Sequence, residues 1–508
     1  MKMLRLNHLN GWLVGLICFG ALIAINCSYL SNPPYWDDIL GLHNQAVWLA
    51  KHHFDVVTLW SGGQSFWEGG ANVYRFGIMP YFNGLLYLLL PSAYVHIFGH
   101  VFNIACLAVT FGLFFSVLRK YIAPWLALLW CIAALCEPVM GGRTAALGQE
   151  CPLIMFGALA IYFIFRGQIR RALLFIVLCS LVKMTGVVIA CALVCWLIAG
   201  LILPRKCFQD GVKHQYSNGL IAVTAVIAAV IFCGLTLFEV DYGFGEWSLS
   251  LRQKLFEQFP LLIPVQLLLL AVLLVTALVR VVKIYLRREP LSELDWFSFF
   301  LLIMLGGFWV SFLMYPAVLP RYTAFIVFPS CAFAALNLTN KRLNVVVVML
   351  FIIIGGANWQ GQFYSLLPGA HRRSGEYLER SREYLQDIEL NRKLCHELER
   401  RSENCPIVAK WPFLQMLTMP EMGYVSSSLN LYDPGNVPLK YVSVGKFEEK
   451  RKMPPETLYV FISNSFEFWP DFGKPLMPEK GDWVFYEEKG LNGFVLVYQS
   501  ENAKQAVK

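Results

Sequence analysis

GWLVGLICFGALIAINCSYLSNPPYWDD, residues 11–38, joins a long apolar run to two adjacent carboxylates. The apolar part, residues 11–30, has the length that an α-helix needs to cross the hydrocarbon core of a bilayer. It carries no clear small-residue cleavage site of the kind that marks a removed signal peptide. We therefore expect a retained membrane helix, followed at once by an acidic pair at the membrane surface.

The composition extends this interpretation to most of the chain. Of the 508 residues 57% are hydrophobic and only 15% are charged, and the mean hydropathy is +0.53. Soluble domains carry about 25% charged residues, so we expect a polytopic α-helical membrane protein. Apolar runs recur as far as residue 358 and predict about eleven transmembrane helices, near 11–30, 94–118, 122–137, 152–165, 172–182, 184–203, 218–238, 261–282, 296–315, 322–338 and 343–358.

Lysine and arginine orient these helices, because short cytoplasmic loops carry an excess of both. With the N-terminus in the cytoplasm, the predicted inner loops hold sixteen of them and the outer loops only seven. An odd number of spans then places the C-terminus outside. We expect a multi-pass protein of the cell inner (plasma) membrane. The net charge of +8 is mostly this orientation signal, so no nucleic-acid partner is predicted.

The chain divides into two parts at about residue 360. Residues 1–360 form the predicted membrane module, whose first outer loop spans 31–93. Residues 361–508 are polar, with charges of both signs, and predict a small outer (periplasmic or extracellular) α/β domain: a helix at 375–401 and strands at 406–410, 457–463, 482–488 and 493–499. In that domain Cys395 and Cys405 form either a disulfide or two separate thiols.

Asp37 and Asp38 admit two interpretations. Apolar residues recur at helical spacing from Asp38 to His53, which predicts a helix lying in the membrane interface. One carboxylate would cap that helix and the other would face its positive dipole end. A single acid is enough for a cap, however, and ionisable groups at membrane depth are costly and usually functional. The second interpretation makes the pair part of a site.

Other polar residues are predicted to gather on the same outer face. For each of them the alternative is an interfacial charge whose stem is buried and whose head reaches water. His96 and His100 have the spacing of a helical metal pair, but no third ligand is evident, so core or interfacial histidines are favoured. The candidates are Glu68, Arg75, Arg143, Glu150, Lys183, Arg321, Tyr322 and, on the loop helix, His43.

Such a set suits the transfer of a sugar carried on a lipid phosphate. The phosphate is already a good leaving group, so the reaction needs a general base for the incoming hydroxyl and positive charge for the departing phosphate. Arginine is favoured there because its planar fork matches phosphate oxygens. Attack opposite the phosphate inverts the anomeric centre. The second carboxylate would orient the acceptor or bind a divalent cation, Mg²⁺ or Mn²⁺; no other cofactor is predicted.

The order of these motifs resembles the GT-C glycosyltransferases, in particular the branch of protein O-mannosyltransferases and lipid A aminoarabinose transferases. In that family an acidic pair follows the first span, as in PPYWDDILGL (33–42). The chain departs from the family in having Asp38 rather than Glu as the second acid, and Glu150 one residue further from its proline. The other similar segments are YRFGIMPYFNGLLY (74–87), ALGQECPL (146–153), SLVKMTG (180–186), RYTAFIVFP (321–329) and, more weakly, WPFLQMLTMPEMGYVS (411–426).

The resemblance implies a role for each candidate. Asp37 would be the catalytic base and Asp38 its partner, while Arg321 and Lys183 would hold the phosphate of a polyprenyl-phosphate sugar donor. The remaining candidates would line the donor-phosphate site (Tyr322, Arg143, Arg75) or the acceptor cavity (Glu68, Glu150, His43). The acceptor would be a protein, a glycan or a lipid, reached from the outer side.

Two other functions remain open at this stage. A flippase or transporter of lipid-linked sugars would share the many spans and the polar cavity, but it would favour charges along a path through the middle of the membrane. An O-antigen ligase or polymerase would usually keep its large outer loop late in the membrane region, whereas this chain has its large loop first.

Overall fold

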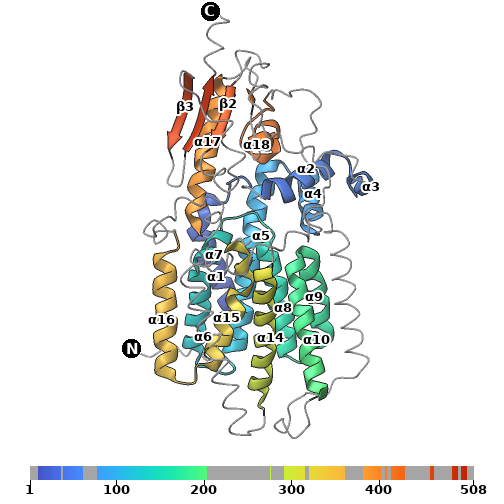
Figure 1. Cartoon of the computed structure of the whole chain (residues 1–508), viewed down its shortest axis with the longest axis vertical. Coiled ribbons are helices and arrows are strands. Elements are labelled where there is room, and N and C mark those ends of the chain that lie inside the picture. Colours follow the sequence, from blue (N-terminus) through green and yellow to red (C-terminus); the bar gives the residue numbers. More distant parts are fainter. Residues whose placement is uncertain are drawn as a thin grey trace, which may run out of the picture.

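The computed structural model describes most of the helical part of the chain and the regular elements that follow it. The described residues are 10–35, 38–60, 77–202, 275, 291–314, 320–360, 381–401, 407–408, 413–429, 458–462, 483–489 and 494–499. A bundle of long helices carries a layer of short helices on one end, and one longer helix and a sheet lie beyond that layer (Figure 1). We call this end of the bundle, where α8 (Glu150–Phe165) begins and α9 (Ile169–Val182) ends, the upper end.

Helices occupy nine of the eleven stretches that the sequence predicts as spans. The other two, 218–238 and 261–282, lie outside the described residues. Within the described part of the chain, three segments are long and apolar enough to cross a membrane: Gly11–Tyr29, Ser92–Leu118 and Glu293–Ser311. The bundle helices are α1 (Gly11–Asn26), α5 (Ser92–Leu118), α6 (Pro124–Cys136), α8 (Glu150–Phe165), α9 (Ile169–Val182), α10 (Val187–Ile202), α14 (Glu293–Met314), α15 (Ala324–Asn337) and α16 (Lys341–Ala357).

The bundle has a buried centre and an apolar outer face, as expected of a helical membrane protein. Every residue of α15 from Ala324 to Leu336 is buried, which fits a helix that is apolar all round. In contrast, Trp12, Leu16 and Ile353 on the outer helices are 59–65% exposed. Large apolar side chains on an outer face indicate contact with lipid rather than with water.

Short helices from the first loop cover the upper end. A π-helical turn at Ile39–His43 leads into α2 (Asn44–Lys51), which matches the helix predicted for this loop. Helices α3 (Val56–Trp60) and α4 (Met79–Leu89) lie in the same layer, and α7 (Pro138–Arg143) lies below them at the top of the bundle (Figure 1). Ala46 and Leu49 of α2 are completely buried, so the apolar stripe read from the sequence is the packed face.

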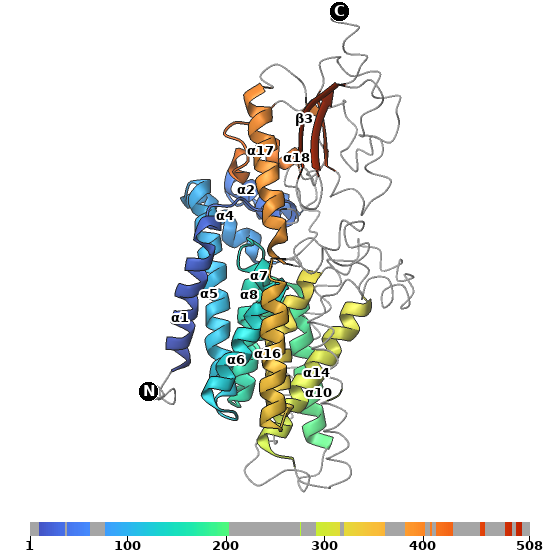
Figure 2. The ribbon, with the colours of Figure 1, turned by 90° about the vertical axis from the view of Figure 1, so that its left-hand side faces the viewer.

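Beyond this layer lie α17 (Leu385–Arg401), α18 (Phe413–Thr418) and a four-stranded sheet (Figure 2). The strands are β1 (Ile407–Val408), β2 (Leu458–Ile462), β3 (Trp483–Lys489) and β4 (Phe494–Gln499), in the order β1-β2-β4-β3. β1 pairs parallel with β2, and the other pairs are antiparallel. All four coincide with predicted strands. Cys395 on α17 is a free, buried thiol, and Cys405 lies outside the described residues.

Two tyrosines attach this last part of the chain to the bundle. Tyr384 donates a hydrogen bond to the carbonyl oxygen of Gly142, over 3.0 Å, and Tyr424 donates one to the carbonyl oxygen of Pro34, over 2.9 Å. Both side chains are buried. The segment around α17 and α18 therefore packs directly on the loops that carry the candidate site residues.

Candidate functional site

The site is organised by the loop between α7 and α8, residues 144–149. Asn103, one of the few polar residues of α5, donates hydrogen bonds to the carbonyl oxygens of Ala146 and Gly148, over 2.9 and 3.1 Å. A buried amide in an apolar helix needs such partners. The loop is therefore fixed against α5, and the first turn of α8, which follows it, has a fixed position.

Glu150 in that first turn is surrounded by three cations. Its carboxylate lies 3.0 Å from Lys183 Nζ, 3.4 Å from Arg143 Nη1 and 3.9 Å from Arg321 Nε. The cations come from the ends of α9 and α7 and from the turn before α15. Three positive neighbours favour the ionised form of the carboxylate. Residues far apart in the sequence thus meet in one group of charged side chains.

Lys183 is the most accessible cation of the three. Its side chain is 13% exposed, against 1% for Arg143 and 2% for Arg321. The ammonium lies 4.3 Å from the centre of the Tyr322 ring, and the Arg321 guanidinium lies 5.4 Å from the same ring. Cation–π contacts of this kind attract the charged head to the face of the ring.

Asp38 faces the same cluster. It occupies the position just before the π-helical turn, yet its side chain makes no capping hydrogen bond. A Cβ atom placed on Gly148 would lie 2.9 Å from Asp38 Oδ1 and would clash with Glu150 Oε2. Both carboxylates therefore flank Gly148. The described Asp38 side chain thus does not cap the helix, and its carboxylate lies near that of Glu150.

Three candidates lie outside the described residues: Asp37, Glu68 and Arg75. Of the others, the structure brings Asp38, Arg143, Glu150, Lys183, Arg321 and Tyr322 together at the upper end of the bundle, and we call these six the ion cluster.

The described ion cluster carries more positive than negative charge, with three cations and two carboxylates. Burying such charges costs several kcal/mol per ion, roughly, unless partners compensate. Three cations that include two buried arginines suit an anionic ligand with several oxygens, such as a phosphate. No group of three or more His, Cys, Asp or Glu side chains in the described segments could hold a metal ion, and the neighbours of Glu150 are cations.

His43 belongs to a neighbouring network of neutral groups. Its Nδ1 is 2.8 Å from the Tyr87 hydroxyl, which is 3.1 Å from His96 Nε2. Burial first, and then the nearby His96 and His100 rings, hold the pKa of His43 well below its ordinary value. The ring is therefore neutral at physiological pH. The described contacts of His43 tie α2 to α4 and α5, and the ring supports the first loop beside the ion cluster.

Sequence reasoning missed the residues that hold the site in place. Asn103 is a polar residue inside a 27-residue apolar helix, and that exception is the signal that marks it. Gly148 precedes Glu150 by two positions and leaves room for two carboxylates. Tyr424 reaches Pro34 from the far end of the sequence. No local pattern predicts that contact.

Comparisons with protein-family models, with curated proteins and with solved structures found no match to this chain.

Proposed function

We propose that this chain is an integral-membrane inverting glycosyltransferase of GT-C type. It moves a sugar from a polyprenyl-phosphate donor to an acceptor hydroxyl on the outer face of the membrane. One observation carries the proposal: Asp38 and Glu150 meet three cations at one end of the bundle, and the most exposed of these cations is Lys183. Carboxylates beside an excess of positive charge are what this transfer requires.

The proposal includes a membrane topology. All eleven apolar stretches span, with the N-terminus in the cytoplasm and residues 361–508 forming an outer α/β domain. The upper end of the bundle is then the outer end. The lower end carries the cationic loops, among them Arg119 and Lys120 after α5 and Lys341 and Arg342 at the start of α16. This bias supports the orientation.

The chemical step needs one base and one anion site. The acceptor oxygen attacks the anomeric carbon, the bond from that carbon to the phosphate oxygen breaks, and the electron pair leaves with the polyprenyl phosphate. A carboxylate of the acidic pair takes the hydroxyl proton. We assign this base to Asp37 and the positioning of the acceptor to Asp38. Lys183 and Arg321 stabilise the negative charge that grows on the leaving phosphate.

The segment around α17 and α18 covers the acceptor side of the site. Tyr424 holds the carbonyl of Pro34, four residues before Asp38, and Tyr384 holds that of Gly142, next to Arg143. An acceptor hydroxyl would therefore approach the acidic pair beneath this segment. The acceptor is a protein, a glycan or a lipid.

The proposal is tested by transfer in vesicles that contain the full chain. A panel of radiolabelled polyprenyl-phosphate sugars is supplied with a crude envelope extract as acceptor, and both transferred label and free polyprenyl phosphate are counted. Asp37→Asn and Asp38→Asn are compared with Asp55→Asn at equal expression. Asp55 is a matched control because it lies in the same loop and accepts a hydrogen bond from the Thr58 backbone, over 3.0 Å.

Loss of transfer in Asp37→Asn, with Asp55→Asn as active as the wild type, is the expected result. Equal transfer by all variants would overturn the assignment of the base. Movement of labelled lipid across the vesicle without release of polyprenyl phosphate would replace the transferase by a flippase. Joining of preassembled glycan chains alone would favour a ligase or polymerase.

A further inference from the structure

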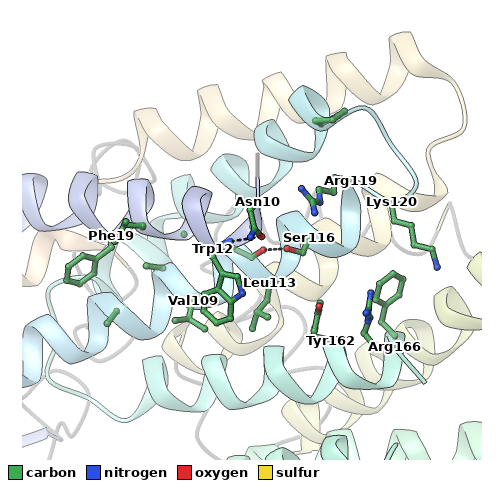
Figure 3. Close-up of a pocket in the computed structure, with 18 residues that line it drawn as sticks. Asn10, Trp12, Phe19, Val109, Leu113, Ser116, Arg119, Lys120, Tyr162 and Arg166 are labelled. Carbon is green, nitrogen blue, oxygen red and sulfur yellow. Dashed lines mark hydrogen bonds between the residues drawn. The ribbon is translucent and has the colours of Figure 1, made fainter. Parts of the chain in front are cut away.

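A second site lies at the opposite end of the bundle from the ion cluster. A groove of about 810 Å³ opens between α1, α5 and α8, near the start of α1 and the ends of the other two helices (Figure 3). Its size falls in the usual range of small-molecule sites, roughly 300–1,000 Å³. The six residues of the ion cluster take no part in it, so the inference does not depend on the proposed transferase.

The floor of the groove is formed by small residues. Gly11 and Gly15 of α1 face Ala108 and Gly112 of α5, and a Cβ atom on Gly15 would lie 3.0 Å from the Ala108 carbonyl oxygen. This small-xxx-small pattern lets two helix backbones approach closely in a membrane. The groove lies beside this closely packed helix pair, and larger side chains form its walls.

The walls are apolar and open toward the surroundings of the bundle. Trp12 and Leu16 of α1 line the groove and are each 65% exposed, and Phe19 marks its far end (Figure 3). From Asn10 to Phe19 the helix rises about 14 Å. This is close to half of a hydrocarbon core about 30 Å thick, so the groove has the depth of one leaflet.

Cations gather at the other end of the groove. Arg119, Lys120 and Arg166 line it there, and all three side chains are exposed (Figure 3). Lys120 also forms a surface ion pair with Glu293, over 2.9 Å. None of the described residues that line the groove is acidic. The groove is thus apolar, one leaflet deep, and bordered by cations at one end. These properties are complementary to a lipid with a negatively charged headgroup.

We propose that this groove binds an anionic phospholipid of the leaflet at the lower end of the bundle, with its acyl chains along α1 and its phosphate at Arg119 and Arg166. This lipid fills the groove beside α1 and α5. It is therefore bound at one defined site and differs from the bulk lipid around the protein.

The test uses native mass spectrometry of the purified full chain in detergent, with dioleoyl phosphatidylglycerol or dioleoyl phosphatidylcholine added at equal concentrations. The wild type should retain one phosphatidylglycerol more tightly than phosphatidylcholine. The double variant Arg119→Gln/Arg166→Gln should bind phosphatidylglycerol about 25-fold more weakly, about fivefold for each cation removed. Its affinity for phosphatidylcholine should not change.

Two further variants separate the groove from general surface charge. Arg170→Gln/Arg171→Gln removes two exposed cations at the same end of the bundle, at the start of α9 and outside the groove, and should leave both affinities unchanged. Ala105→Phe places a ring in the groove without changing its charge and should weaken binding of both lipids. It decides the question if the arginine variant fails to fold.

Equal retention of the two lipids by the wild type, or unchanged binding in Ala105→Phe, would overturn the proposal. An equal loss in the two double arginine variants would reduce the effect to surface charge and would also overturn it. Displacement of phosphatidylglycerol by a smaller amount of polyprenyl phosphate would assign the groove to the donor lipid instead. A dimer whose formation Ala105→Phe abolishes would assign it to a second copy of the chain.

Discussion

Replacing Glu150 by Gln removes one negative charge from the ion cluster with almost no change of shape. In the wild type Lys183 Nζ lies 3.0 Å from the carboxylate, and at an effective dielectric constant of about 20 this pair attracts by about 5 kcal/mol. Desolvation cancels much of that attraction. Removing one partner of a buried pair nevertheless costs about 3–5 kcal/mol, because the other charge stays buried without compensation. We therefore expect Glu150→Gln to lower the free energy of unfolding by about 3–5 kcal/mol.

The assay is thermal unfolding of the purified full chain in detergent, followed by tryptophan fluorescence. A loss of about 3–5 kcal/mol should lower the Tm by about 3–5 °C, because the entropy of unfolding grows with chain length. Glu293→Gln is the matched control: Glu293 also lies in a first helical turn and also pairs with a lysine over 2.9 Å, but its side chain is 59% exposed. Exposed pairs contribute about 0–1 kcal/mol, so its Tm should hardly change.

The double variant Glu150→Gln/Lys183→Met removes the charge and one of its partners together. If the two side chains are coupled as the geometry indicates, the double variant should be less destabilised than the sum of the single ones, by about 0.5–3 kcal/mol. Equal Tm values for Glu150→Gln and Glu293→Gln would refute the reasoning. Strict additivity in the double variant would refute it as well.

Three further perturbations test the surroundings of the site. Gly148→Ala should lower sugar transfer about 100-fold, because its methyl group meets Asp38 Oδ1 at 2.9 Å and displaces both carboxylates; initial rates in vesicles measure this. Tyr424→Phe should cost about 1–3 kcal/mol, since it leaves the Pro34 carbonyl buried without its donor, and faster limited proteolysis of the last part of the chain should follow. The folded-state pKa of His43 is lowered below its ordinary 6.5. Stability should therefore fall as the pH drops below 6.5, by at most about 1.4 kcal/mol per pH unit, and Tm values from pH 8 to 5 should show a shallower slope in His43→Gln.

Each of these variants has a control at an uncrowded or exposed position. Gly20→Ala adds the same methyl group where no neighbouring atom lies within 4 Å. Tyr94→Phe removes a hydroxyl from a side chain that is 61% exposed, and His53→Gln changes an exposed histidine in the first loop. If a control behaves as its partner does, the corresponding contact is not the cause of the effect.

The helices could be predicted from the sequence because bilayer thickness fixes the length of an apolar run. For example, the apolar run at 94–118 corresponds to α5 (Ser92–Leu118), and the run at 343–358 corresponds to α16 (Lys341–Ala357). The strands at 458–462 and 494–499 were predicted equally well, since β-branched and aromatic residues between turn residues favour them. In each case the signal lies within the segment itself.

The pairing inside the site could not be predicted from the sequence. Arg143 and Glu150 are seven positions apart, whereas Lys183 reaches Glu150 from 33 positions away. The sequence marked all three as polar residues on one face, but it could not show that Glu150 is enclosed by cations. The orientation of Asp38 was equally hidden, because a helix cap and a site carboxylate occupy the same position before a helix. In the structure the Asp38 carboxylate lies beside Gly148 and makes no capping hydrogen bond.

Stability alone does not explain why the bundle contains these charges. Replacing a buried ion pair by apolar residues of similar volume is often neutral or stabilising by about 1–4 kcal/mol, and the bundle around Glu150 is apolar. A cluster kept for stability would also be closed. In this one Lys183 keeps 13% of its side chain exposed and lies 4.3 Å from the centre of the Tyr322 ring. In the proposed reaction Glu150 holds the cations in place while the site is empty. The donor phosphate then approaches Lys183 first, because Lys183 is the most exposed of the three cations.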